Sequence, residues 1–108
     1  MSSSNNAATE ILCLLNMVTQ EDLMDDEEYE DIMDDIKTEC EKFGTVLSIE
    51  IPRPIEGKEV PGLNKVFVEF EDKTSCQKAA ESLTGRKFAD RIVVTSFMDP
   101  LKFQNRQF

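Results

Sequence analysis

The sequence predicts an α+β domain with the element order βαββαβ and one additional C-terminal helix. Three observations lead to this prediction. Apolar residues switch repeatedly between the two-residue period of strands and the longer period of helices. Glycine, proline or a capping residue bounds most of these segments, and 108 residues suffice for one hydrophobic core but not for two. We therefore expect a four-stranded antiparallel sheet with two helices on one face.

The first half of the chain supplies a strand and a long helix. Residues Ile11–Met17 form a short apolar run bounded by polar residues, which is typical of a strand buried on both faces. Between Asp25 and Phe43, apolar residues recur at steps of three, four and seven, as an amphipathic helix requires. Acidic residues Asp25–Glu28 occupy the start of this helix, where the helix dipole stabilises carboxylates. We expect Gly44 to stop it.

Two strands separated by a long loop follow. Residues Val46–Ile51 are rich in β-branched side chains and are ended by proline, so they predict a second strand. The proline- and glycine-containing segment 52–62 predicts a loop. Residues Lys65–Phe70 alternate and predict a third strand. One face of that strand is expected to carry Val66, Val68 and Phe70, and the other Lys65, Phe67 and Glu69.

The last part of the chain predicts a second helix, a fourth strand and a short tail helix. Residues Lys73–Leu83 have a helical apolar face and are closed by Thr84-Gly85. A loop at Arg86–Asp90 leads into a strand at Arg91–Phe97. The tail helix is capped by Asp99 and has proline at its first position. This order is the split βαβ arrangement of ferredoxin-like folds.

The charge distribution disfavours nucleic acid as a general partner. The formal net charge is −10, and residues Glu21–Glu41 carry nearly all of the excess, opposed within that segment only by Lys37. Non-specific binding of nucleic acid depends on basic side chains that displace counterions from phosphates. A cationic partner is therefore favoured.

Other classes of protein receive little support from the composition. The three cysteines are odd in number and lack metal-ligand spacing, which favours a reducing cytosolic or nuclear setting. The chain contains no histidine and no nucleophile, phosphate-binding or calcium-binding motif, so we expect no enzyme, metal or cofactor. No membrane-spanning or signal segment is expected. Residues 1–9 are expected to be a flexible N-terminal segment, and residues 10–108 the domain.

Two segments resemble the ribonucleoprotein motifs of the RNA recognition motif (RRM) family, namely Leu12–Met17 and Leu63–Phe70. RNA-binding members of this family stack bases on aromatic side chains of these strands. Here Cys13 and Lys65 occupy two of the stacking positions, and only Phe67 remains aromatic. One ring is a poor platform for stacking contacts worth roughly 1 to 3 kcal/mol per base. The fold is thus expected without its usual RNA chemistry.

An acidic first helix, the triplet Arg86-Lys87-Phe88 and a helical tail together make the chain similar to the U2AF homology motif, the peptide-binding variant of this fold. The resemblance covers about residues 10–108. It implies a ligand with several basic residues and one Trp, whose indole enters a pocket between the first helix and the triplet. It also implies a nuclear role in 3′ splice-site recognition and early spliceosome assembly. The implied partners are a branchpoint-binding splicing factor and a U2 snRNP subunit, with RNA bound by other domains of the full protein.

These expectations select seven candidate ligand-binding residues. On a helical wheel, four acidic residues form a stripe beside the apolar face of the first helix. Phe88 would contact the indole, Arg86 would lie over it as a cation–π partner, and Glu39 would hold the Arg86 guanidinium in place. The full set is Glu28, Asp31, Asp35, Glu39, Arg86, Lys87 and Phe88.

The face of the sheet that the two helices do not cover suggests an alternative function. Cys13, Leu15 and Phe67 would form an exposed apolar patch unless Leu101 and Phe103 of the tail helix covered it. Such a cover would block the surface that other members use for RNA. The alternative function is weak single-stranded RNA binding through Phe67, Lys65 and Arg53.

Overall fold

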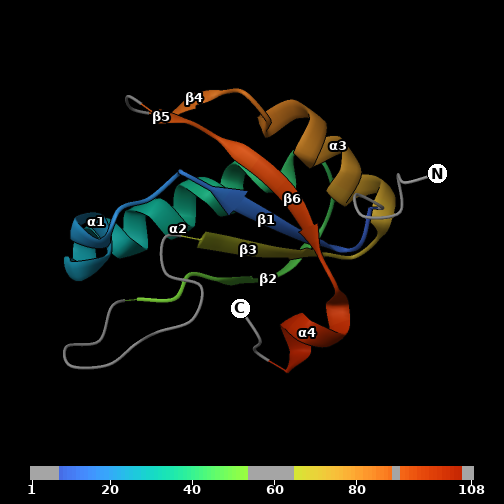
Figure 1. Cartoon of the computed structure of the whole chain (residues 1–108), viewed down its shortest axis with the longest axis horizontal. Helices are drawn as coiled ribbons and strands as arrows, with labels where there is room; N and C mark the ends of the chain where they lie inside the picture. Colours follow the sequence, from blue (N-terminus) through green and yellow to red (C-terminus); the bar gives the residue numbers. More distant parts are fainter. Residues whose placement is uncertain (1–7, 54–64, 89–90, 106–108) are drawn as a thin grey trace.

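The computed structural model describes residues 8–53, 65–88 and 91–105. Four strands form an antiparallel sheet in the order β2-β3-β1-β6, and a separate two-stranded pair, β4-β5, lies beyond α3 in the chain (Figure 1). The elements are β1 (Ile11–Leu15), α1 (Gln20–Met24), α2 (Asp26–Glu41), β2 (Val46–Glu50), β3 (Lys65–Phe70), α3 (Lys73–Leu83), β4 (Lys87–Phe88), β5 (Arg91–Ile92), β6 (Val94–Met98) and α4 (Pro100–Gln104). The predicted α+β fold is therefore confirmed.

The main core lies between the sheet and the two long helices, α2 and α3. Val66, Val68 and Phe70 point into it from β3, whereas Phe67 points to the opposite face, as the alternation predicts. Other large, fully buried side chains of this layer are Leu12, Leu14, Leu23, Ile36, Cys40 and Cys76. The acidic helix is thus fixed to the sheet by its apolar face.

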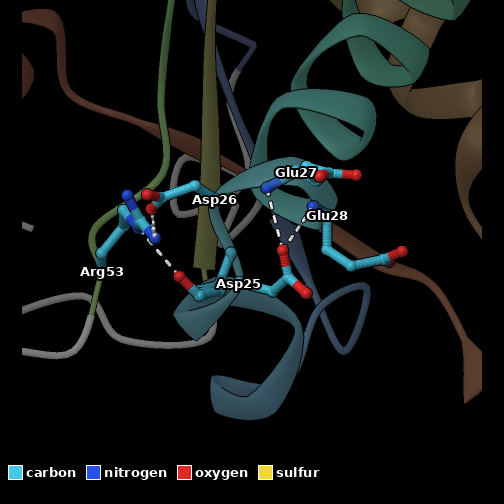
Figure 2. Close-up of polar contacts among 6 residues, drawn as sticks. Asp25, Asp26, Glu27, Glu28 and Arg53 are labelled. Carbon is cyan, nitrogen blue, oxygen red and sulfur yellow. Dashed lines mark hydrogen bonds and ion pairs between the residues drawn. The ribbon is translucent and has the colours of Figure 1, made fainter.

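A short helix, α1, precedes the acidic helix and was not predicted. Thr19 caps it through a capping box, in which the Thr19 hydroxyl accepts from the Asp22 N–H and the Asp22 carboxylate accepts from the Thr19 N–H, each at 3.2 Å. The predicted helix start at Asp25 is one residue early, because Asp25 is the N-cap of α2. Its carboxylate accepts from the N–H groups of Glu27 and Glu28 (Figure 2).

The predicted role of Gly44 as a helix stop is wrong. Helix α2 ends at Glu41, with a right-handed Lys42 as its C-cap, and Gly85 is the one glycine with a positive φ, at 82°, in the described part of the chain. What Gly44 provides is space, because a Cβ atom at this position would collide with the side chain of Ser75. Gly85 does close α3, as predicted.

The predicted strand at Arg91–Phe97 is interrupted, and part of the predicted loop before it forms β4. Val93 causes the interruption, because its backbone pairs away from the sheet. Its carbonyl accepts from the Gly85 N–H at 2.9 Å, and its N–H donates to the Arg86 carbonyl at 2.9 Å. β5 therefore pairs with β4, and β6 starts only at Val94. Residues 89–90 lie outside the described part.

The first strand ends two residues earlier than predicted, at Leu15. Asn16 stops it by adopting a left-handed conformation with a φ of 65°. The Asn16 side-chain amide donates to the Ile92 carbonyl at 3.0 Å, which ties this turn to β5. β2 likewise ends at Glu50, one residue before the predicted limit.

The tail helix α4 forms as predicted and covers the open face of the sheet through one side chain. Asp99 accepts from the Leu101 N–H at 2.9 Å, and proline occupies the first helical position. Phe103 is 8% exposed and packs against Phe67, with ring centroids 6.4 Å apart. The predicted contribution of Leu101 is wrong, since that side chain is 67% exposed. Side chains two positions apart on a helix point in different directions, so only one of Leu101 and Phe103 can face the sheet.

All three cysteines are buried, and none forms a disulfide in this structure. Loss of hydration on burial is the main cause that raises the pKa of Cys40 and of Cys76 to about 12, from the ordinary value of 9.0. Above pH 9 the unfolded chain therefore loses thiol protons that the folded protein keeps.

We expect the free energy of unfolding to fall by roughly 1 kcal/mol per thiol between pH 8 and pH 10, because stability from a raised thiol pKa is lost above the unfolded value. Urea denaturation at the two pH values measures this. Cys40→Ala should lose less stability over the same interval. An identical pH dependence in the wild type and in Cys40→Ala would contradict the expectation.

Candidate functional site

A cavity of about 140 Å³ lies between α2 and the segment that follows α3. Its floor is apolar, and its charged lining residues include Asp35 and Glu39 from α2 and Arg86 and Lys87 from the other side. The full lining is Leu14, Met17, Asp35, Ile36, Glu39, Cys40, Leu83, Arg86, Lys87 and Val93. Four of the seven predicted site residues thus meet at one pocket.

The helical period of α2 places its acidic residues at this pocket. Ile36 and Cys40 are buried in the core, and each is preceded by an acidic residue that lies at the edge of the buried face. Asp35 and Glu39, four residues apart, therefore stand side by side along the same side of the helix. Asp35 is exposed and Glu39 is half-buried.

Backbone contacts around Gly85 position Arg86 opposite Glu39. The Arg86 N–H donates to the Leu83 carbonyl at 3.1 Å, and the Arg86 carbonyl accepts from Val93. The Arg86 Nη1 atom then lies 3.1 Å from Glu39 Oε1, so the predicted pair of these two residues forms. It joins residues 47 positions apart in the sequence and spans the pocket rim.

Lys42 also binds Glu39, and this contact was not predicted. Its Nζ atom lies 2.7 Å from Glu39 Oε2, so each carboxylate oxygen has a different cation. The Lys42 hydrogen bond is the largest cause that lowers the pKa of Glu39; desolvation opposes it, and the Arg86 hydrogen bond adds to the lowering. The only sequence signal for this contact is the three-residue spacing on a helix.

The other predicted site residues do not line this pocket. Glu28 and Asp31 are exposed nearer the start of α2. Together with Asp35, they have carboxylates that make no ion pair with any residue that the structure describes. The backbone of Phe88 pairs with Arg91 in the β4-β5 ladder. The position of the Phe88 side chain lies outside the described part, so its predicted contact with a ligand stays a prediction.

Arg53, one of the residues considered for RNA binding, is used inside the domain. Its Nε atom donates to the Leu23 carbonyl at 2.8 Å, and its Nη2 atom lies 2.7 Å from Asp26 Oδ1 (Figure 2). Its guanidinium carbon also lies 4.4 Å from the centroid of the Tyr29 ring. Arg53 therefore joins the segment after β2 to the α1–α2 junction.

The open face of the sheet offers little for base stacking. Phe67 is 2% exposed under the cover of Phe103. A second, more polar cavity of about 270 Å³ lies beside this ring, and its lining includes Lys65 and Lys102. Cations are thus present there, but Phe67, the aromatic side chain at a stacking position, is buried. Leu63, the first residue of the second motif-like segment, lies outside the described part.

No candidate metal-binding group and no candidate membrane-spanning helix is found among the described residues. No group of three or more histidine, cysteine, aspartate or glutamate side chains among them could hold a metal ion. Over the same residues, no helix has both the length and the apolar character needed to cross a bilayer.

Comparison with known proteins gives three kinds of match, namely a family, a solved structure and curated relatives. The RNA recognition motif family matches residues 33–94. The RRM of RNA15, a solved structure, has a TM-score of 0.61 and 17% identity, covering 91% of this chain and 99% of that one. At this identity the structural match supports the fold alone.

Curated relatives are more similar in sequence. A large subunit of splicing factor U2af from Nicotiana plumbaginifolia is 45% identical over 102 residues, which are 94% of this chain and 18% of that protein. A U2af large subunit from Triticum aestivum is 42% identical over 101 residues, which are 93% of this chain and 19% of that protein. The chain thus spans less than a fifth of the length of these relatives. These similarities confirm the family resemblance predicted from the sequence.

Proposed function

This chain belongs to the RNA recognition motif family, and on that premise we propose that it is a protein-interaction module acting in pre-mRNA splicing. Its ligand is a short basic peptide with one Trp. The similarity to U2af large subunits supports the splicing role and a nuclear location. Partners of the branchpoint-binding type and of the U2 snRNP follow from the resemblance to the U2AF homology motif. The family is one of binding domains, so no enzymatic step is proposed.

The size and lining of the pocket support an aromatic side chain as the central contact. A volume of about 140 Å³ is well below the roughly 300 to 1,000 Å³ of sites for small organic ligands. It is close to the roughly 150 Å³ of a protein cavity that binds benzene, so it suits an aromatic side chain better than a larger organic ligand. The Arg86 guanidinium at the rim supplies a flat cation that can cover the face of an indole.

The acidic stripe supports basic residues beside that ring. Glu28, Asp31 and Asp35 are exposed, and their carboxylates have no internal cation within the described part. Asp35 lines the pocket, so it can pair with a ligand cation at the pocket rim, where hydration is reduced. The net charge of −10 would also speed the approach of a basic peptide.

RNA binding through this domain is the less supported function. It would need an exposed ring on the sheet, and Phe67 is buried. Arg53 already has three internal contacts. Single-stranded RNA binding that weakens steeply with salt would favour this alternative.

The proposal predicts that a basic peptide with one Trp binds at least tenfold more tightly than its Trp→Ala version, since a buried Trp is a typical hot spot. Arg86→Ala and Phe88→Ala should each cost more than about 1 kcal/mol of binding free energy, because each would remove a contact with the indole. Asp35→Ala should chiefly change the salt dependence of binding. Isothermal titration calorimetry measures all of these.

Lys73→Ala serves as the matched control for Arg86→Ala. It also removes one positive charge, from an exposed residue at the start of α3 that does not line the pocket. Its affinity for the basic peptide should stay the same or rise slightly. Equal affinity for the two peptides, or no loss of affinity in either Arg86→Ala or Phe88→Ala, would remove the pocket proposal.

A further inference from the structure

Glu39 and Asp35 both line the pocket, but among the described residues only Glu39 has cationic partners. Both oxygens of the Glu39 carboxylate already accept hydrogen bonds, Oε1 from Arg86 and Oε2 from Lys42. Asp35 makes no ion pair with any described residue. Two adjacent carboxylates at one pocket are therefore in different electrostatic states.

Lys42 is the residue that creates this difference. It does not line the pocket, and it reaches Glu39 from one turn further along the chain. An exposed pair of this spacing contributes little by itself. Here, however, Lys42, Glu39 and Arg86 form a network of three charges, in which Glu39 is only 31% exposed. Networks hold side chains in place better than isolated pairs do.

We propose that Lys42 is a positioning residue that sets the specificity of the pocket. With Lys42 on one oxygen and Arg86 on the other, the negative charge of Glu39 is compensated by two cations, so it attracts a ligand cation less strongly than Asp35 does. Lys42 also fixes the orientation of the Glu39 side chain that pairs with Arg86, and Asp35 remains the pocket carboxylate that binds the basic part of the peptide. The inference rests on the proposed function and assigns a role to a residue outside the pocket lining.

Removal of Lys42 should change the selectivity of the pocket between the two peptides rather than simply lower the affinity for both. In Lys42→Met, Glu39 gains a free oxygen at the pocket rim, to which a ligand Arg or Lys can bind. Basic peptides without Trp should then bind better, because the Glu39 carboxylate has lost one of its two compensating cations. We expect the ratio of the two dissociation constants, for Trp→Ala peptide over Trp peptide, to fall about threefold, which matches the strength of one exposed ion pair.

Lys37→Met is the matched control. Lys37 is exposed on the same helix, makes no ion pair with any described residue, and its removal changes the net charge equally. Both variants should therefore attract basic peptides somewhat more strongly. Only Lys42→Met should change the ratio, and Lys42→Arg, which keeps a cation at the same position, should preserve the wild-type ratio.

The test uses the whole chain, with calorimetry for both peptides and an NMR titration of the Glu39 carboxyl. The Glu39 pKa should rise in Lys42→Met and change little in Lys37→Met. Equal ratios in Lys42→Met and Lys37→Met, or equal Glu39 pKa values, would overturn the role of Lys42. If the wild type binds neither peptide, or both equally, the proposed function fails. The specificity role of Lys42 then fails with it, whatever the change in the Glu39 pKa.

Discussion

Phe103→Ala is expected to lower the free energy of unfolding by about 3 kcal/mol, at the lower end of the range for buried aromatic residues. Phe103 is the one buried side chain of α4, and it belongs to a small cluster with Ile11, Cys13 and Phe67. Its removal would expose this cluster and leave α4 without its anchor. Urea denaturation, followed by circular dichroism, measures the loss.

Leu101→Ala is the matched control for this variant. It removes an apolar side chain from the same five-residue helix, but one that is 67% exposed, so its effect should stay within about 0.5 kcal/mol. Similar losses in the two variants would show that α4 does not act as a cover. A gain of salt-dependent RNA binding in Phe103→Ala would mean that the cover, and not the sequence of the strands, suppresses RNA binding.

The long elements of this fold were predictable because their signals are local. β3 and α3 have the predicted bounds, since each contains several repeats of its own period. Helix α1 has only five residues, too few for a helical period to be visible. β4 and β5 have two residues each, and no alternation can be seen over two residues. Their pairing depends on Val93, whose partners lie in the turn after α3.

The candidate site likewise combines features that the sequence predicts with features that depend on tertiary contacts. The pair of Arg86 and Glu39 was predictable, because the fold order places the segment after the second long helix beside the acidic helix. The apolar floor was not, since Met17 and Val93 reach the pocket from separate irregular segments whose courses depend on tertiary contacts. Lys42 had a local signal, but a three-residue spacing on an exposed helix is too common to single out one lysine.

The close contact of Gly44 with α3 leads to the second large expected effect. A Cβ atom at position 44 would overlap the Oγ and Cβ atoms of Ser75, while the Ser75 Cα would be at an ordinary 3.6 Å. Ser75 cannot simply rotate away, because its Cβ atom is itself part of the clash. Gly44→Ala should therefore force the end of α2 and the start of α3 apart and destabilise the fold by about 2 kcal/mol.

A double-mutant cycle separates this clash from any other effect of alanine at position 44. Ser75→Gly removes both overlapping atoms at a cost of about 1 kcal/mol for glycine in a helix. In that background Gly44→Ala should cost little, because only ordinary contacts remain, giving a coupling of about 1 kcal/mol or more between the two positions. Additive effects in urea denaturation would mean that the chain relieves the contact in another way. Since Gly44 follows the helix that carries Glu39, the Gly44→Ala variant should also bind the Trp peptide more weakly, and the Ser75→Gly background should restore that binding.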